Sequence, residues 1–317
     1  MKKILIKYKK SSFDEIAFFY SYLGDYLKDY LLFDIKSIFP SIEEEKEIEE
    51  NVVIFSHLYK NIDKDKLLYL INSKKNIEEY IDKENEINNY DKIFEYISYI
   101  QRKINIKHVN NGNIFESIDE TKIGKDVIFG KGNIIEKNAI IIGKSAFINQ
   151  NFISSFSFVE KSVFSNYNKI VSSTVINSNI GNSNILGPYC NVHHQSKIGN
   201  NVIIGNFVEI KNSSIGSNSK VKHLSYVGDA TLGERVNIGS GVVVCNYDGK
   251  TKNHTLIHDD VFIGSNSTLI SPLIIEEKSF IAAGSIITEN VPSFSLAIGR
   301  ARQMNKNGYY KDKETKC

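Results

Sequence analysis

His223 is the side chain whose type and context best suit acid–base chemistry in this sequence. It lies in the segment KHLSYVGD, where Tyr226 follows three residues later and a Gly-Asp pair ends the motif. Imidazole titrates near neutral pH and can take up a proton without heavy desolvation, as a general base must. A lone histidine here would be interpreted as a surface residue at a corner of the fold, so it is the surrounding motif that favours catalysis.

Two other kinds of chemistry are less well supported. The chain has seven histidines, but those in its second half form no HxxxxH-type ligand pair, so zinc-dependent hydrolysis is not favoured and no metal is expected. Cys245 carries a thiol, a group that can act as a nucleophile. However, the three cysteines, Cys190, Cys245 and Cys317, have neither CxxC nor disulfide-framework spacing, and reduced thiols are expected.

The structure that must position these residues is indicated by aliphatic residues that recur at every sixth position. Small or polar residues often follow the aliphatic position, as in Ile198-Gly199 and Ile263-Gly264. This period is typical of a left-handed parallel β-helix, in which three six-residue units close one triangular coil and stacked coils bury an aliphatic column. The repeat is less regular from Ile123 to Ile141 and is hard to follow between about residues 150 and 178. The interval between aliphatic residues shortens to five at Ile210–Ile215 and Val227–Leu232. The regular positions are Ile180, Leu186, Val192, Ile198, Ile204 and Ile210, then Ile257, Ile263, Leu269, Ile275, Ile281 and Ile287.

Composition is that of a cytoplasmic protein. The net charge of +2 gives no argument for nucleic acid as a partner. No apolar run reaches the ~18 residues that a membrane span needs. The N-terminal segment MKKILIKYKK returns to lysine after a few apolar positions, without a small-residue cleavage site, and so is not expected to be a signal peptide.

Glycine content marks a domain boundary near residue 110. Gly24 is the one glycine before Gly112, although the chain has 20. We expect a small α/β domain over residues 1–110, the β-helix over 111–298 and a tail over 299–317. Within the first domain, the patterns predict strands at Ile4–Tyr8 and Val52–Ser56, and helices at Phe13–Leu31, Lys64–Tyr80 and Tyr90–Ile104. The acidic run EEEKEIEE is interpreted as a solvated surface.

Several motifs in the rod together resemble a known family. They are GPYCNVHH, GNFVEIKNSSIG, KHLSYVGDATLGERVNIGSG, CNYDGKTKNHT and IAAGSIIT, and they span residues 187–288. They are similar to the acetyltransferase half of the bacterial bifunctional enzyme that joins glucosamine-1-phosphate N-acetyltransferase to N-acetylglucosamine-1-phosphate uridyltransferase. The resemblance implies an acetyl-CoA-dependent acetyltransferase of UDP-N-acetylglucosamine biosynthesis, a route to cell wall precursors, assembled as a homotrimer with sites between subunits.

The resemblance also assigns roles to individual residues. His223 would be the general base. Substrate contacts would come from Lys211 for the phosphate, Tyr226 and Asn237 for the sugar, and Lys252, of the same or a neighbouring subunit. Acetyl-CoA would lie in a groove between adjacent rods, and its contacts would be Ser240, Asn246, Tyr247, Ser265 and Ala283, with Arg300 and Lys306 near the nucleotide phosphates. Direct attack of the amine on the thioester needs no acyl-enzyme, which leaves Cys245 structural.

Two departures from the family pattern qualify this expectation. The family has an arginine that grips the sugar phosphate where this chain has His193, in NVHHQS; a histidine can donate hydrogen bonds but lacks the bidentate guanidinium fork. The uridyltransferase half of the family opens with a glycine-rich phosphate-binding loop, whereas this chain begins MKKILIKYKKSSFDEIAFF. We therefore expect the uridyltransferase activity to be absent and residues 1–110 to be a degenerate or replaced remnant.

Two alternatives remain open. An N-acyltransferase of the same architecture could act on another amino sugar, for example a nucleotide-linked one, as the loss of the arginine at His193 would suggest. A catalytically silent scaffold or regulatory trimer could bind a partner through residues 1–110. The presence together of His223, Tyr226, Asn237, Asn246, Tyr247 and Lys252 argues against the silent form.

Overall fold

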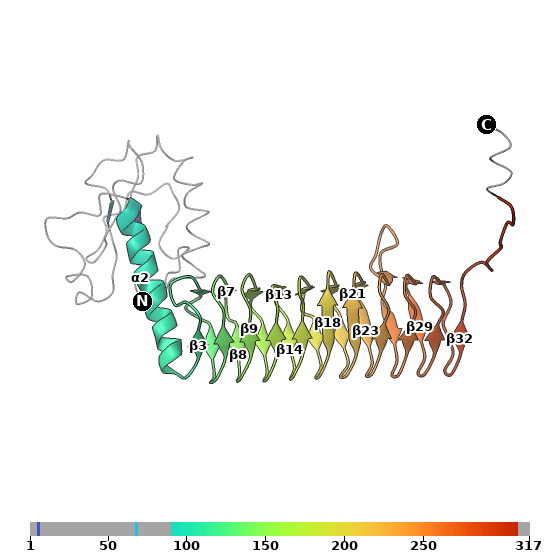
Figure 1. Cartoon of the computed structure of the whole chain (residues 1–317), viewed down its shortest axis with the longest axis horizontal. Helices are drawn as coiled ribbons and strands as arrows, with labels where there is room; N and C mark the ends of the chain where they lie inside the picture. The colour runs from blue at the N-terminus through green and yellow to red at the C-terminus, as the bar shows by residue number, and fades with distance from the viewer. Residues whose placement is uncertain (1–4, 7–66, 69–89, 310–317) are drawn as a thin grey trace, which may run out of the picture.

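The computed structural model describes residues 5–6, 67–68 and 90–309, and most of these form one long rod (Figure 1). The chain winds round the rod and places successive strands on three faces in turn, so from β3 to β31 each paired strand lies in parallel beside the third strand along, and β30 pairs with β32 at the end. β4 (Lys122–Ile123), for example, pairs with β7 (Ile140–Ile142). The parallel β-helix predicted from the six-residue repeat is confirmed.

The strands of the three faces are short and evenly stacked along the rod. The first face contains β3 (Ile114–Phe115), β6 (Ile134–Ile135), β9 (Phe152–Ile153), β12 (Lys169–Ile170), β15 (Ile185–Leu186), β18 (Ile203–Asn206), β21 (Lys220–His223), β24 (Asn237–Ile238), β27 (Phe262–Ile263), β30 (Phe280–Ile281) and β32 (Leu296–Ala297). The second face contains β4, β7, β10 (Phe158–Glu160), β13 (Thr174–Ile176), β16 (Asn191–His193), β19 (Glu209–Lys211), β22 (Tyr226–Gly228), β25 (Val243–Cys245), β28 (Thr268–Ile270) and β31 (Ile286–Ile287). The third face contains β5 (Ile128–Phe129), β8 (Ala146–Phe147), β11 (Val163–Phe164), β14 (Asn179–Ile180), β17 (Lys197–Ile198), β20 (Ser214–Ile215), β23 (Ala230–Leu232), β26 (Thr255–Ile257) and β29 (Leu273–Ile275).

The core is the column of residues that the repeat predicts. All residues of the two regular series are at most 5% exposed, because alternate side chains of a strand point to opposite faces and one member of each strand points to the axis. The blurred stretch belongs to the same column, but five rather than six residues separate Val159 from Phe164 and Ile170 from Val175. Phe164 also stacks on Phe147, with ring centroids 4.6 Å apart. The repeat therefore continues there with shorter sides.

A ladder of buried asparagines runs inside the N-terminal half of the rod. In each rung, the Oδ1 atom of one asparagine accepts hydrogen bonds from the backbone N–H and the Nδ2 of the next, at 2.9 to 3.0 Å. The last Oδ1 accepts the backbone N–H of Val202 at 2.7 Å. Because buried polar groups are costly unless paired, this ladder fixes the register of the coils it joins. Its members are Asn113, Asn133, Asn151, Asn168 and Asn184.

Helix α2 (Tyr90–Asn110) packs against the first coil of the rod. The buried Gln101 side chain donates to the carbonyl of Ile123 at 3.0 Å. The fully buried Asn105 side chain donates to two more carbonyls of that coil, at 2.7 and 2.8 Å. Burial, and then the charge of Lys107, lowers the pKa of His108 to about 4, so its ring packs on Phe129 in the neutral form. The helix thus covers the N-terminal end of the rod.

Three of the elements predicted for the N-terminal region overlap residues that the structure describes. The predicted helix at Tyr90–Ile104 is confirmed and continues to Asn110. The predicted strand at Ile4–Tyr8 contains β1 (Leu5–Ile6), which pairs antiparallel with β2 (Leu67–Leu68). The predicted helix at Lys64–Tyr80 is therefore wrong at Leu67–Leu68, because periodicity does not distinguish a strand from a helix within a short apolar run.

The remaining predictions for this region lie outside the described residues: the helix at Phe13–Leu31, the strand at Val52–Ser56, the acidic run and the N-terminal uridyltransferase features. The division into three domains stays a prediction. Among the described residues, no helix has the length and apolarity that a bilayer span requires.

Candidate active site

His223 lies where the chain leaves the first face of the rod and turns towards the second. It ends β21, and Leu224 makes the turn with a φ of 51°, in the left-handed region. One coil earlier, Asn206 occupies the same position in β18, and its Oδ1 lies 2.6 Å from Nδ1 of His223. An amide oxygen only accepts hydrogen bonds, so Nδ1 carries the hydrogen. The lone pair of Nε2 then faces the surface as a proton acceptor, as general-base chemistry requires.

Several of the predicted acetyl-CoA contacts lie in line with His223. Ser240, Ser265 and Ala283 occupy its position in the three following coils, joined by backbone hydrogen bonds from Gly241 to His223 (3.1 Å), from Asn266 to Ser240 (2.7 Å) and from Gly284 to Ser265 (2.8 Å). Adjacent strands are about 4.8 Å apart, so the row advances by that distance at each coil. In the next coil, the register of β30 and β32 puts Gly299 level with Ala283, and Arg300 follows it beside the row, with its Cδ 3.7 Å from where a Cβ on Gly284 would be. We call His223, Ser240, Ser265, Ala283 and Arg300 the corner track.

The turn residue beside each position of the corner track changes in size along the rod. Tyr189, Phe207 and Leu224 are large, apolar and 58 to 62% exposed, and the rings of the first two stack with centroids 5.7 Å apart. In the coils after His223, the turn residues are Gly241, Asn266 and Gly284. The large residues form a ridge that ends at His223, whereas Ser240, Ser265 and Ala283 lie next to small or polar turn residues.

A cluster of cationic and histidine side chains lies on the second face, next to this corner. His193 and Lys211 are register partners in β16 and β19, as are Glu209 and Tyr226 in β19 and β22. Nε2 of His193 is 3.0 Å from Oε1 of Glu209. The Nδ1 atoms of His193 and His194 are 2.5 Å apart, so one hydrogen lies between them. Partial desolvation, then the charges of His193, Lys211 and Lys252, lower the pKa of His194.

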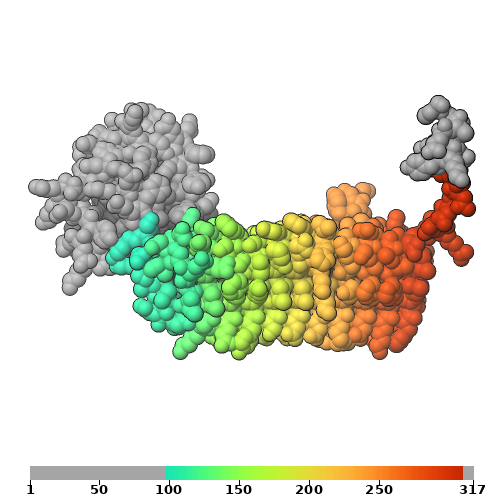
Figure 2. All heavy atoms as spheres, viewed as in Figure 1, coloured from blue at the N-terminus to red at the C-terminus, as the bar shows by residue number. Residues whose placement is uncertain are grey.

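Lys252 lies on a loop that projects from the rod between β25 and β26 (Figures 1 and 2). Tyr247 and Lys252 form an antiparallel bridge across the loop. Asp248 accepts the backbone N–H groups of Lys250 and Thr251, both at 2.8 Å, and side-chain hydrogen bonds from Thr251 and Asn253. These bonds hold the pKa of the Asp248 carboxyl well below its usual range. The loop is therefore internally ordered and carries Lys252 on a fixed hairpin.

Asn246 and Tyr226 are close together at the root of this loop. Nδ2 of Asn246 is 3.4 Å from the hydroxyl of Tyr226 and 2.5 Å from Oδ2 of the buried Asp229. A Cβ on Gly228 would lie 2.3 Å from the Tyr226 hydroxyl, so the tyrosine ring needs a glycine at that position.

Two predicted residues do not join the others within one chain. Asn237 lies in the flat part of the first face, paired with Lys220 and Phe262. Lys306 lies on the exposed tail that leaves the rod after β32, with its Nζ 5.8 Å from the centre of the Tyr309 ring (Figure 1). Within the described residues, no group of three or more histidine, cysteine or acidic side chains is placed to hold a metal ion.

Asn206, Glu209 and Asp229 were missed from sequence, although all three lie inside the motifs quoted above. Asn206 precedes its partner His223 by 17 residues, and Asp229 precedes Asn246 by 17. This is the length of a coil with one five-residue side, so adding the coil length to each predicted residue could have found them.

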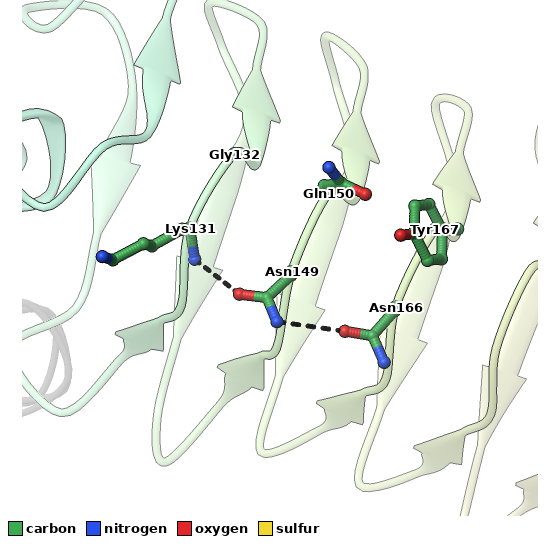
Figure 3. A pocket seen from close by; sticks show the side chains of 6 residues that line it. All are labelled: Lys131, Gly132, Asn149, Gln150, Asn166 and Tyr167. Carbon is green, nitrogen blue, oxygen red and sulfur yellow. Dashed lines mark hydrogen bonds between the residues drawn. The ribbon is translucent and has the colours of Figure 1, made fainter.

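A surface hollow of about 420 Å³ lies elsewhere, at the corner between the third and first faces (Figure 3). In it, Asn149 accepts the backbone N–H of Lys131 at 2.8 Å and donates to Asn166 at 3.3 Å. None of the predicted site residues lines it. Its lining residues are Lys131, Gly132, Asn149, Gln150, Asn166 and Tyr167.

Comparison with known proteins finds similarity in the rod to a transferase family model and to bifunctional proteins. Residues 177–212 match the family model described as bacterial transferase hexapeptide (six repeats). The chain is 43% identical over 217 residues to the bifunctional protein GlmU of Clostridioides difficile (strain 630), covering 68% of this chain and 47% of that protein. It is 44% identical over 210 residues to bifunctional protein GlmU of Clostridium acetobutylicum, covering 66% of this chain and 46% of that protein. The chain therefore spans about half the length of the curated relatives it matches.

Solved structures give a more distant likeness. The UDP-N-acetylglucosamine acyltransferase of Francisella novicida has a TM-score of 0.41 and 16% identity, over 58% of this chain and 66% of that one.

Proposed function

We propose that the rod, which matches a hexapeptide transferase model and is similar in sequence to part of bifunctional GlmU, is a transferase domain that moves the acetyl group of acetyl-CoA to the amine of glucosamine 1-phosphate. The single observation that carries the proposal is the corner track, in which a histidine, whose Nε2 has no hydrogen bond to the described residues, is followed by a row of small residues that ends beside an arginine. The thin pantetheine arm would lie along the small residues, and Arg300 would bind a phosphate of CoA.

In this proposal, each part of the site has one task. Nε2 of His223 accepts a proton from the substrate amine while the amine nitrogen bonds to the thioester carbonyl carbon. The carbon–sulfur bond then breaks, and the proton goes to the sulfur of CoA. Lys211 and Lys252 bind the sugar phosphate as point charges, and Tyr226 and Asn246 orient the reacting groups. Asn237 and Lys306 would serve the site of a neighbouring chain.

The test is release of free CoA thiol from acetyl-CoA by the purified protein with glucosamine 1-phosphate. Glucosamine 6-phosphate and UDP-linked amino sugars are measured beside it. Turnover with glucosamine 1-phosphate supports the proposal. Turnover with a UDP-linked amino sugar alone would support the second candidate, an acyltransferase for a nucleotide-linked amino sugar. No turnover with any amino sugar would favour a silent scaffold.

The contact between His193 and Glu209 is the observation that favours the second candidate. Glu209 engages Nε2 of His193, and the other ring nitrogen is engaged by His194, so neither nitrogen points freely at a phosphate. A weaker phosphate grip at this place would suit a sugar whose phosphate carries a nucleotide.

His193→Arg tests where the phosphate binds. We expect the KM for glucosamine 1-phosphate to fall about tenfold with kcat nearly unchanged, because a bidentate guanidinium contact contributes about 1.4 kcal/mol. The double variant His193→Arg with Glu209→Gln frees the arginine from the carboxylate and should show the larger decrease. Steady-state kinetics check both, and the KM for acetyl-CoA is the internal control. An unchanged sugar-phosphate KM in both variants would contradict this placement.

We also propose that the site is completed by a second copy of the chain, in a trimer. The ridge of Tyr189, Phe207 and Leu224 exposes large apolar side chains beside His223, which a neighbouring chain would cover. Phe207→Glu should therefore convert the oligomer to monomer, measured by light scattering after size-exclusion chromatography. Phe294→Glu, at another corner and 70% exposed, is the matched control and should leave the mass unchanged. An oligomer that persists in Phe207→Glu would contradict the ridge as interface.

A further inference from the structure

Asp229 is a buried carboxylate that joins three successive coils. It lies in the turn from β22 to β23, is 8% exposed and has a φ of 49°. Its Oδ1 accepts a hydrogen bond from Nδ2 of Asn212 in the preceding coil, and its Oδ2 accepts one from Nδ2 of Asn246 in the following coil, both at 2.5 Å. Each carboxylate oxygen is thus paired with one amide, which meets the requirement for burying a charge.

Both ends of the projecting loop are bonded to this one residue. Asn246 begins the loop and binds the Asp229 side chain, while the backbone N–H of Thr255, where β26 begins, donates to the Asp229 carbonyl at 3.3 Å. The two ends are also joined to each other, since Asn253 N–H donates to the Asn246 carbonyl at 2.6 Å. The loop, which carries Tyr247 and Lys252, is therefore anchored at its root by Asp229.

Asp229 also decides which way the Asn246 amide faces. A carboxylate can only accept hydrogen bonds, so the amide must turn its NH₂ group towards Asp229. The second hydrogen of that NH₂ points to the Tyr226 hydroxyl, 3.4 Å away. Both donors are then used, and Oδ1 of Asn246 accepts no hydrogen bond from the described residues. The group left to meet a ligand is an acceptor, suited to an N–H.

We propose that Asp229 is a positioning residue of the acyl-transfer site: it fixes Oδ1 of Asn246 to accept an N–H of the substrates and holds the loop that carries Lys252. This inference rests on the proposed function. The N–H comes either from the sugar amine or from an amide of pantetheine. A change in kcat would indicate the amine, and a rise in the KM for acetyl-CoA would indicate pantetheine.

Asp229→Asn is the discriminating variant. Asparagine keeps the size of the side chain and tolerates a positive φ, but it cannot accept from both amides with the strength of a carboxylate. We expect kcat/KM to fall by about 10- to 100-fold, the fold-change that corresponds to one hydrogen bond to a charged group. The matched control is Asn212→Gly, which removes the other hydrogen bond to the same carboxylate, tolerates the φ of 48° and does not touch Asn246. It should stay within about threefold of the wild type while losing comparable stability.

A swap and a protease assay complete the test. Asp229→Asn combined with Asn246→Asp restores a carboxylate–amide pair and should recover part of the lost kcat/KM.

Trypsin cleavage after Lys250 and Lys252, followed by mass spectrometry, should be faster in Asp229→Asn than in the wild type and unchanged in Asn212→Gly. The cleavage rate does not depend on turnover. A wild-type protein that transfers no acetyl group would contradict the proposed function, but faster cleavage of Asp229→Asn than of Asn212→Gly would still show that Asp229 anchors the loop. Equal activity and equal cleavage in Asp229→Asn and Asn212→Gly would overturn the inference.

Discussion

His223→Ala should lower the kcat of acetyl transfer by roughly 10²- to 10⁴-fold, the usual contribution of a general base. The melting temperature should stay within about 2 °C of the wild type, because an exposed side chain with few contacts contributes little to stability. The side chain is exposed, and the structure gives it one side-chain hydrogen bond, to Asn206. A large kinetic loss without a stability loss is the signature of a group that acts on the substrate.

His258→Ala is the control for this prediction. His258 is a partly exposed histidine of the rod, 3.5 Å from Glu276, and lies outside the corner track. Thiol release and thermal unfolding are measured on both variants. A large drop in melting temperature for His223→Ala would show that the residue is structural, and equal kinetic losses in both variants would remove His223 from its proposed role.

A chain that begins at Asn111 should melt well below one that begins at Tyr90. The shorter chain lacks helix α2 and with it three side-chain hydrogen bonds from Gln101 and Asn105 to the first coil. At about 1 kcal/mol each, these bonds contribute about 3 kcal/mol, and a domain of this size shifts by about 2–4 °C per kcal/mol. We therefore expect a difference of at least about 6–12 °C, to which the lost apolar burial adds.

Differential scanning calorimetry of the two truncated chains measures this effect, and acetyl transfer by the chain that begins at Tyr90 is its functional counterpart. Retained activity would show that residues 1–89 are dispensable for the reaction. Coincident melting of the two chains would contradict a stabilising role for α2.

The fold of the rod could be predicted because its signal is local and repeated. A six-residue interval between aliphatic side chains sets which residue of each strand points to the axis, and residues such as Leu186 and Ile263 are buried as the interval predicts. The repeat could not be followed between residues 150 and 178 because Phe164 and Val175 come after sides of five residues. These shorter sides break the six-residue interval in the sequence, but the column of buried side chains continues through them. The cap formed by α2 could not be predicted, since its bonds to the first coil depend on where a helix and a coil meet in space.

The site was predicted in part for a related reason. Ser240 and Ala283 were found through the family motifs, and the structure places them in one row with His223. The partners that orient those residues come from neighbouring coils, 17 residues away, and no motif contains both members of such a pair. Asp229 has a recognisable setting, GDA, but its role depends on Asn212 and Asn246 being stacked above and below it.

The asparagine ladder makes the N-terminal half of the rod a modular spacer. Each rung from Asn113 to Asn184 gives and receives the same bonds, so one coil could be duplicated or removed within this part and every amide would still find a partner. Each such event would move α2 by about 4.8 Å along the axis relative to His223 and leave the coils beyond Val202 unchanged. The distance between the two ends of the rod can therefore be changed in whole steps, by gene duplication or by design, without redesigning the coils that carry the candidate site.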